Sequence, residues 1–398
     1  MKITFISNYI NHHQIPLCDA IYKLIGDNFT FVQAMDMEQK RVEMGWGVDL
    51  EKYPYVAEYS GDKSYCESMI RNADVLILGW SGQKELDDFV LELGKPVLRI
   101  SERIYREGQW KAISPKGLIS KYKEHIRYRD KKVYLLCAGA YVASDFELIH
   151  AYPGKKYIWG YFPPTQHLTK EQKEERFLEF ENKKIELLWA GRFIKLKHPE
   201  FAINALRDLS KKGYDLHLTM IGDGEMLPGM KELSQIYGLE GKITFLGNLD
   251  PKEVRKEMLK SDIFLFTSNY LEGWGAVVNE AMNAGCAVVA SAEAGSVPYL
   301  IHDGFTGMIY KNGEYNDMLL RLTELLDNPS RITAIGREAY EEICEVWNAE
   351  HAAAELIRFC HELLNGKPSP AISGPLSYAP SIKPPAMRRT LQEDNHLA

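Results

Sequence analysis

The sequence contains no long hydrophobic run. In its 398 residues, no apolar stretch approaches the ~18 residues that a membrane-spanning helix requires. The run that follows Met1-Lys2 ends at Ile6, which is too short for the core of a signal peptide. The six cysteines are scattered and form no C-x-x-C pair, a pattern that favours reduced, buried thiols over disulfides or zinc ligands. We therefore expect a cytoplasmic protein.

An excess of positive charge is also lacking. The net charge is -7 and no nucleic-acid-binding motif appears, so no nucleic-acid partner is expected. With 45% hydrophobic and 26% charged residues, the composition is that of a globular protein. The chain is too long for a single hydrophobic core, which predicts two domains.

The first half alternates short apolar runs with helical patterns, which is typical of βαβ units and a parallel sheet. The double proline Pro163-Pro164 interrupts regular structure, so a Rossmann-like N-terminal domain is expected over residues 1–164. The expected strands are Lys2–Ser7, Phe29–Gln33, Asp74–Gly79, Pro96–Ile100, Ala140–Ala143 and Lys156–Trp159.

The second half repeats this α/β plan, which predicts another Rossmann-like, doubly wound domain over residues 165–347. A helix over 348–365 could return to the first domain. From Gly366 the composition changes to prolines among serines and alanines without a hydrophobic period, so a disordered tail is expected over 366–398.

The stretch from Leu271 to Ala290 carries the strongest functional signal. An apolar strand leads into a glycine-interrupted loop and then a short helix, which together offer unpaired N–H groups to a phosphate. Glu272 and Glu280 bracket the loop with seven residues between them, and carboxylates accept hydrogen bonds from sugar hydroxyls. The arrangement suggests a ligand of the form sugar–phosphate–sugar, a nucleotide sugar. Either glutamate alone could equally be a solvated surface residue.

This pattern resembles the E-x7-E signature of the retaining glycosyltransferases of the GT-B fold, group 1 (family 4) class. The resemblance rests on an acid, Gly-aromatic-Gly, an apolar pair, a second acid followed by Ala-Met, and then Gly before a β-branched strand. It implies two Rossmann-like domains that face a cleft. It also implies transfer of a sugar from a nucleoside diphosphate sugar, such as a UDP- or GDP-sugar, to an acceptor hydroxyl, with no other cofactor.

Residues 189–197 look like the G-R-x4-K segment of the same family, which places Arg192 and Lys197 on the donor diphosphate. Fixed cations can neutralise the charge that develops on a diphosphate leaving group. Two solvated loop cations, as we expect Lys195 to be, are the alternative. No D-x-D triplet occurs, and the resemblance implies a reaction without a bound metal.

The resemblance also implies roles for the other donor-site residues. Glu280 would hold the ribose hydroxyls, and Glu272 would contact the donor sugar and take part in catalysis with Arg192 and Lys197. Backbone groups of the loop and helix start would contact sugar and phosphate, a turn would lie beneath the nucleotide, and a further segment would edge the base. These groups are Gly273, Trp274, Gly275, Ala276 and Val277; Gly222; and Gly247 and Asn248.

Over the first half the resemblance is weak, and the acceptor site is predicted from position alone. Asn11, His12 and His13 precede an expected helix and could face the cleft, although a helix cap and two surface histidines fit equally. Glu102 and Arg103 end a strand, where they could contact a sugar or simply pair with each other.

Residues 111–132 contain eight Lys or Arg and only two acids, while Ile119, Tyr122 and Ile126 recur at helical spacing. A basic amphipathic helix of this kind could contact an anionic membrane at the inner face. The alternative is an apolar stripe that faces the core, with a solvated cationic back.

The resulting prediction is a hexosyltransferase that works on a glycan or lipid-linked acceptor, in polysaccharide or glycolipid biosynthesis. Two alternatives stay open. A nucleotide-sugar epimerase on the same fold would use acid–base residues such as Glu102, His12 and His13 and would need no second substrate. A non-catalytic sugar-binding assembly module would keep the fold alone.

Overall fold

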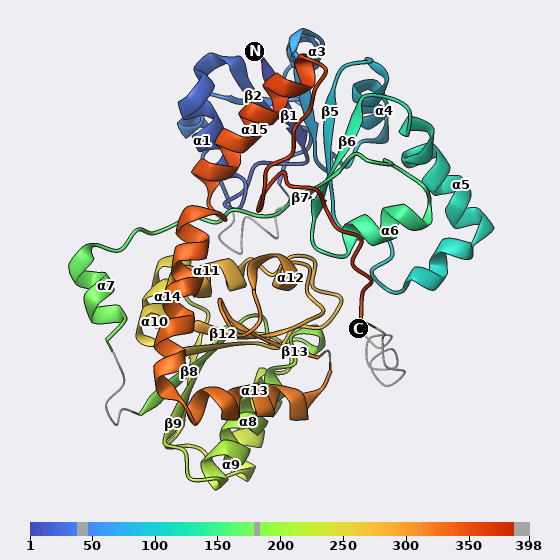
Figure 1. The fold of residues 1–398 in the computed structure, drawn as a ribbon. Coiled ribbons are helices and arrows are strands. Elements are labelled where there is room, and N and C mark those ends of the chain that lie inside the picture. The colour runs from blue at the N-terminus through green and yellow to red at the C-terminus, as the bar shows by residue number, and fades with distance from the viewer. Residues whose placement is uncertain (38–46, 179–183, 312, 386–398) are drawn as a thin grey trace. The chain divides into compact units, whose positions relative to one another are not determined.

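The computed structural model describes residues 1–37, 47–178, 184–311 and 313–385 (Figure 1). The chain divides into two compact units, which are described separately. The first unit is formed by Met1–Pro164 together with Val346–Lys383, and the second mainly by Thr165–Glu345. Each unit contains one parallel sheet, so the predicted pair of Rossmann-like α/β domains is confirmed.

The sheet of the first unit has the order β3-β2-β1-β4-β5-β6-β7, and every neighbouring pair is parallel. Its central strands are buried on both faces, which is why they read as continuous apolar runs in the sequence. The strand order reverses between β1 and β4, where open α/β sheets bind ligands. The strands are β1 (Ile3–Ser7), β2 (Phe29–Gln33), β3 (Val56–Glu58), β4 (Val75–Leu78), β5 (Val97–Ser101), β6 (Val133–Ala138) and β7 (Lys156–Trp159).

One expected strand lies elsewhere than predicted. A strand was expected at Ala140–Ala143, whereas the structure has β6 at Val133–Ala138 and begins helix α6 at Val142. The whole stretch is apolar, so hydrophobicity does not locate the strand within it. Gly139, at a φ of 136°, follows β6 and leads into the turn before α6.

The helices of the first unit are α1 (Ile15–Ile25), α3 (Lys63–Asn72), α4 (Lys84–Glu92), α5 (Pro115–Glu124), α6 (Val142–Leu148) and α15 (Ala349–Leu364). Helix α15 comes from the far end of the chain and packs beside α1 (Figure 1). The Asn348 side chain caps it by accepting from the His351 N–H at 2.7 Å. The Phe359 ring of α15 lies 4.7 Å from the Tyr157 ring of β7.

The described part of the expected tail, residues 366–385, has a defined position along the edge strand β7. The Leu376 N–H donates to the Ile158 carbonyl, and the Ile158 N–H donates to the Ser377 carbonyl, both at 2.8 Å. Leu376 is fully buried, and the Tyr378 ring stacks 5.5 Å from that of Tyr157. The segment thus satisfies backbone groups that an open sheet edge would leave unpaired. Residues 386–398 lie outside the described part of the chain.

The sheet of the second unit has the order β10-β9-β8-β11-β12-β13, again with parallel pairs. The strand order reverses between β8 and β11, so the loops that follow these two strands are neighbours. The strands are β8 (Ile185–Ala190), β9 (Leu216–Ile221), β10 (Ile243–Gly247), β11 (Ile263–Phe266), β12 (Ala287–Ser291) and β13 (Met308–Tyr310).

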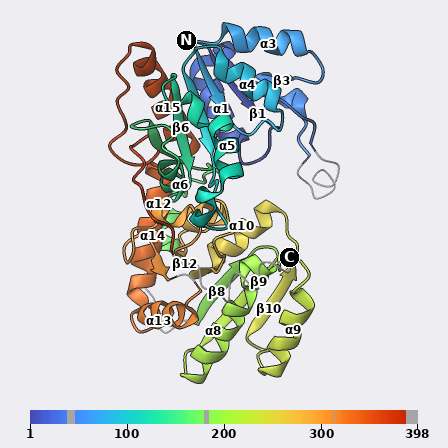
Figure 2. The same ribbon diagram turned by 90° about the vertical axis from the view of Figure 1, so that its right-hand side faces the viewer.

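The helices of this unit are α7 (Lys170–Arg176), α8 (Pro199–Lys211), α9 (Leu227–Ile236), α10 (Pro251–Lys260), α11 (Val277–Asn283), α12 (Val297–Leu300), α13 (Tyr315–Leu326) and α14 (Pro329–Glu345). Helices α8, α9, α13 and the start of α14 share one hydrophobic core with the sheet (Figure 2). On α14, Gly336 lies against Gly285, where an added Cβ would come within 2.2 Å of the Gly285 oxygen. The glycine therefore permits close packing of α14 beside the end of α11.

Among the described residues, none of the helices combines the length and the apolar character that crossing a membrane requires.

Candidate functional site

The loops that follow β8 and β11 are joined at the point where the strand order reverses. The Asn269 N–H donates to the Leu196 carbonyl at 2.9 Å, and the Thr267 hydroxyl donates to the Lys197 carbonyl at 2.5 Å. The Trp189 indole donates in turn to the Thr267 oxygen at 2.9 Å. These bonds fix the two loops that carry the predicted donor-site residues.

Two of the predicted residues meet in an ion pair. The Lys197 ammonium donates to the Glu272 carboxylate, and the two side chains are only 15% and 17% exposed. The ammonium also lies 5.9 Å from the centre of the Phe266 ring. The contact holds a cation and an acid at the carboxyl ends of β8 and β11, on residues 75 positions apart.

Arg192 lies in the same loop as Lys197 but points to the solvent. Its side chain is exposed and makes no hydrogen bond or ion pair with any described residue. Its guanidinium can therefore bind an incoming anion without first breaking a protein contact. Lys197 would have to exchange or share its carboxylate partner.

Glycines let the loops after β8 and β9 approach each other closely. Gly222 has a φ of 124°, and an added Cβ would lie 2.0 Å from the Gly191 oxygen. At Gly224 the added Cβ would lie 2.6 Å from the Phe193 oxygen. The Gly222 N–H donates to the Gly247 carbonyl at 2.8 Å, which adds the end of β10 to the same cluster. Only glycine fits this spacing.

Asn248 follows Gly247 and is exposed, so it lies at the rim of this cluster rather than within it.

The predicted phosphate loop is built around a buried tryptophan. The Trp274 side chain is 1% exposed and its indole donates to the Asn279 amide oxygen at 2.8 Å. Trp274 is thus part of the scaffold, and only its backbone could contact a ligand. The Gly273 and Trp274 carbonyls accept from the N–H groups of Gly295 and Ser296, at 3.0 and 3.2 Å.

The N–H groups after Trp274 are available. Gly275 has a φ of 84°, and an added Cβ would lie 2.6 Å from the Phe266 ring. Within the described part of the chain, the N–H groups of Gly275, Ala276 and Val277 donate no hydrogen bond. They lead into α11, where the helix dipole favours negative charge.

Glu280 lies in the first turn of α11 and differs from Glu272 in having no partner. Its carboxylate makes no hydrogen bond or ion pair with the described residues. Burial raises the pKa of the Glu280 carboxyl above its ordinary value, and the positive charge of Arg255 opposes this shift. Glu280 therefore retains an unused acceptor for a ligand hydroxyl.

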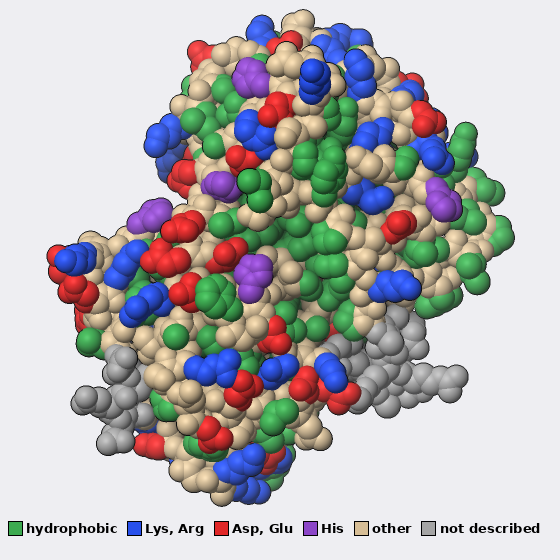
Figure 3. Space-filling model, viewed as in Figure 1, with side chains coloured by type: hydrophobic (Ala, Val, Ile, Leu, Met, Phe, Trp, Pro, Cys, Tyr) green, Lys and Arg blue, Asp and Glu red, His purple; other side chains and the backbone are tan. Residues whose placement is uncertain are grey.

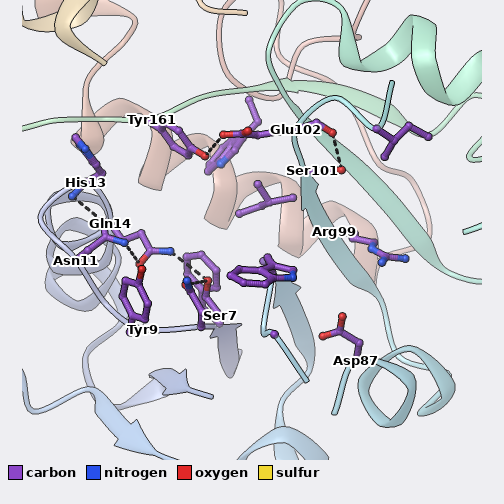
Figure 4. A pocket seen from close by; sticks show the side chains of 18 of the residues that line it. Ser7, Tyr9, Asn11, His13, Gln14, Asp87, Arg99, Ser101, Glu102 and Tyr161 are labelled. Carbon is purple, nitrogen blue, oxygen red and sulfur yellow. Dashed lines mark hydrogen bonds between the residues drawn. The ribbon is translucent and has the colours of Figure 1, made fainter. Parts of the chain in front are cut away.

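The first unit has a cavity of about 1070 Å³ at the carboxyl ends of β1, β4, β5 and β7 (Figure 4). This is again the point where the strand order reverses, between β1 and β4. The cavity lies within this unit and is lined by Asn11, His13 and Glu102 of the predicted residues, whereas His12 does not line it.

Asn11 and His13 have separate roles in the turn before α1. The Asn11 side chain accepts from the His13 N–H at 3.0 Å and donates to the Gln14 side chain at 3.2 Å, so it shapes the turn. The His13 ring faces Tyr161 at 6.2 Å and His12 at 4.0 Å. Burial, aided by the charge of His12, lowers the pKa of His13 to about 4, which keeps the imidazole neutral at pH 7.

Glu102 and Arg103 do not pair with each other. Glu102 accepts from the Tyr161 hydroxyl at 2.6 Å and forms an ion pair with Arg106. Arg103 instead pairs with the buried Asp145, with two bonds of 3.2 Å. Glu102, Tyr161 and Arg103 all line the cavity, but the charge of Arg103 is already paired with that of Asp145.

Sequence reasoning missed Tyr161 and Arg106. Burial, together with the charge of Glu102, raises the pKa of the Tyr161 hydroxyl well above its ordinary value, so the hydroxyl stays a donor. Arg106 could have been found from its position four residues after Glu102, since the two form an i,i+4 pair. Tyr161 is 59 residues from Glu102, and only the fold brings them together.

No group of three His, Cys, Asp or Glu side chains with the arrangement of a metal site occurs among the described residues.

Comparison with known proteins identifies the second unit. Residues 170–342 match the family model described as glycosyl transferases group 1. An uncharacterized glycosyltransferase of Methanocaldococcus jannaschii is 30% identical over 188 residues, which is 47% of either chain. A D-inositol 3-phosphate glycosyltransferase of Corynebacterium aurimucosum is 27% identical over 187 residues, 46% of this chain and 44% of that one. The chain spans about half the length of these curated relatives.

Solved structures extend the likeness to both units. The crystal structure of the Anabaena protein HepE in complex with UDP matches with a TM-score of 0.65 and 15% identity, over 90% of this chain and all of that one. Sucrose-phosphate synthase from Thermosynechococcus elongatus matches with a TM-score of 0.64 and 14% identity, over 92% of this chain and all of that one. At these identities the likeness concerns the fold, which is of the GT-B type.

Proposed function

Because residues 170–342 belong to the group 1 glycosyltransferases on a GT-B fold, we propose that the chain is a glycosyltransferase that uses a nucleoside diphosphate sugar. The observation that carries this proposal is the cluster at the end of β8 and β11. It combines the exposed Arg192, the Lys197–Glu272 pair and the unused N–H groups before α11. The loops, which hydrogen bonds hold together, thus offer three kinds of anion-binding group.

The donor diphosphate is assigned to the cations and the loop. Arg192 offers two parallel N–H groups to phosphate oxygens, and Lys197 offers a point charge that is already held in place by Glu272. The N–H groups of Gly275, Ala276 and Val277 would bind oxygens on the same diphosphate. Together these groups would neutralise the charge that develops on the leaving group.

The two glutamates would accept hydrogen bonds from the sugar hydroxyls on either side of the diphosphate. Glu280 has no partner among the described residues, so its carboxylate is free to accept from the two ribose hydroxyls. Glu272 is oriented by Lys197 and would accept from a hydroxyl of the transferred sugar. Gly222 and Gly247 would lie beneath the nucleotide, with Asn248 at the rim near the base.

We propose transfer with retention of configuration and without a bound metal. The acceptor would attack from the side on which the diphosphate leaves, so that a diphosphate oxygen takes the acceptor proton. The carboxylate of Glu272, the nearest acid to the Lys197 ammonium, would hold the sugar in place. Arg192, Lys197 and the loop N–H groups would supply the positive charge that a metal supplies in other enzymes.

The cavity of the first unit is assigned to the acceptor, which we propose to be a glycan or a lipid-linked sugar. Its walls carry sugar-binding groups, with Glu102 and Tyr161 joined in a hydrogen bond and His13 neutral at pH 7. Aromatic faces such as Trp80 and Trp159 also line it. With such an acceptor the chain would act in polysaccharide or glycolipid biosynthesis. Peripheral contact of residues 111–132 with an anionic membrane is a separate proposal, because it depends on the exposed side chains of that segment and not on the donor or acceptor site.

The deciding experiment incubates the purified full-length chain with UDP-, GDP- and dTDP-sugars, with and without glycan and glycolipid acceptors, and reads the products by mass spectrometry. A glycosyltransferase releases the nucleoside diphosphate, and does so faster with the right acceptor. An epimerase would change the sugar without any acceptor, and a binding module would leave every donor intact. Either of these outcomes would contradict the proposal.

A further inference from the structure

Helix α5 turns its apolar side to the solvent. Leu118, Ile119 and Tyr122 are 38%, 60% and 57% exposed, and no residue of the helix is buried. Their spacing places the three side chains on one side of the helix. The more covered positions of the helix include Gly117 and Ser120, which bring almost no apolar surface to the protein. A helix of a globular protein normally shows the opposite orientation.

The preceding 3-10 helix η4 (Gln109–Ile113) extends the apolar surface. Trp110 is 62% exposed and Ile113 is 82% exposed. In the space-filling view, apolar side chains gather along the edge of the first unit that α5 forms (Figure 3). We name the group Trp110, Ile113, Leu118, Ile119 and Tyr122 the α5 surface. Large apolar residues gathered in this way mark an interaction site more often than scattered ones do.

Free cations flank the α5 surface. Lys116 and Lys123 are exposed and have no ion-pair partner among the described residues. At their positions in the helix they lie together on one side of the apolar stripe. Lys121, in contrast, is neutralised by Glu124, and Arg127 is neutralised by Asp88.

The apolar stripe differs in its residues from the one expected at Ile119, Tyr122 and Ile126. Ile126 was expected to continue the stripe of Ile119 and Tyr122, but α5 ends at Glu124. Ile126 lies in the 3-10 helix η5 (Ile126–Tyr128) and packs against the core of the first unit. Trp110 and Ile113, on the N-terminal side, take its place in the exposed surface.

We propose that the α5 surface docks on an anionic lipid bilayer. Its aromatic and branched side chains would enter the boundary between headgroups and acyl chains, and Lys116 and Lys123 would meet lipid phosphates. The charge favours a bilayer over a second copy of this chain, because two α5 surfaces face to face would bring four unpaired lysines together. This inference rests on the exposed surface and not on the proposed glycosyl transfer.

The docking would bring the membrane beside the cavity of the first unit. Lys121 and Glu124 lie on α5 and also line that cavity.

The test is flotation of the full-length chain with vesicles of phosphatidylcholine alone or mixed with phosphatidylglycerol. We expect binding to the anionic vesicles, and a loss of about tenfold or more in affinity for Ile113→Ser with Ile119→Ser. Lys116→Ser with Lys123→Ser should lose about thirtyfold in affinity, with a smaller salt dependence. The tryptophan emission of the wild type should shift to the blue when the vesicles bind, because Trp110 would enter the bilayer. This shift should be absent from Trp110→Phe.

The matched controls lie in the second unit. Ile236 and Leu320 are 70% and 63% exposed, so Ile236→Ser with Leu320→Ser removes as much exposed apolar surface elsewhere. Lys211→Ser with Lys212→Ser removes the same net charge from an exposed site. Melting temperatures show that each variant is folded. The proposal is wrong if the wild type does not bind anionic vesicles. It is also wrong if the control double substitutions weaken binding as much as the α5 double substitutions do. Self-association lost only in the α5 variants, without vesicle binding, would show a second copy instead.

Discussion

Replacing Gly222 by alanine tests the loop packing on which the donor site depends. The added Cβ would lie 2.0 Å from the Gly191 oxygen, where ordinary contacts begin near 3.4 Å. One of the two loops would therefore have to move by about 1.4 Å, and the loop after β8 carries Arg192 and Lys197. A residue with a Cβ also resists the φ of 124° at this position.

The expected cost has two parts. The backbone strain is about 1–2 kcal/mol, and forcing a side chain into a packed site adds about 1–3 kcal/mol. Urea denaturation should thus show Gly222→Ala to be destabilised by about 2–5 kcal/mol. A displacement of about 1 Å in binding groups can cost about a hundredfold in function, so donor binding should weaken strongly.

Gly213→Ala is the matched control. Gly213 also has a positive φ, 96°, but an added Cβ there meets no atom within 4 Å. It should lose only the backbone part, about 1–2 kcal/mol, and bind nucleotide as the wild type does. Equal stability and equal nucleotide affinity of the two variants would refute the close packing of the loops after β8 and β9.

Four further predictions concern other parts of the chain. Glu280→Gln should weaken donor binding by about ten- to a hundredfold in calorimetry with the fold intact, because a charged hydrogen bond is worth about 1.5–3 kcal/mol; unchanged affinity would exclude the ribose contact. A chelator should leave the transfer rate nearly unchanged, whereas Arg192→Ala should lower it about 10²–10³-fold; loss of activity in EDTA that magnesium or manganese restores would contradict this. His13 has a folded pKa of about 4 against 6.5 unfolded, so it contributes stability above pH 6.5 that is lost as the pH falls toward 4. When the pH is lowered from 7 to 5, the free energy of unfolding of His13→Asn, measured in urea, should therefore fall by about 2 kcal/mol less than that of the wild type. Identical pH profiles of the two proteins would show that the imidazole is not held neutral. Leu376→Ala should destabilise the first unit by about 2–5 kcal/mol while Ile372→Ala, at a fully exposed position, should not; equal melting temperatures would mean that the segment is not docked.

The fold class could be predicted because local sequence patterns indicate the strands and helices of both units. Strands such as β1 and β4 are short apolar runs separated by helical periods, because parallel strands that are buried on both faces consist almost entirely of apolar residues. The boundaries of β6 could not be predicted, since apolar residues continue from Val133 through Ala143 and only the turn at Gly139 divides strand from helix. Hydrophobicity identifies the element but not its ends in such a stretch.

The meeting of Lys197 and Glu272 follows from strand order, which the resemblance implied and local sequence does not contain. The partner of Glu102 was not predicted for the same reason, because Tyr161 reaches it only through the pairing of strands. The docked segment around Leu376 escaped detection since one buried side chain and a few backbone bonds leave no period to recognise. Likewise, the packing of α5 against the rest of the first unit decides which side of the helix is covered, and the periodicity of Ile119 and Tyr122 alone does not predict that side.

The most direct test of the account is a calorimetric titration of UDP and GDP into the wild type and three single variants. Arg192→Ala and Lys197→Ala remove the two cations assigned to the diphosphate, and Lys195→Ala removes a cation of the same loop that has no assigned role. The account predicts that one of the nucleotides binds, that the first two variants each lose at least about tenfold in affinity, and that Lys195→Ala binds as the wild type does. Nucleotide binding that is equal in all four proteins, or absent from the wild type, would contradict it.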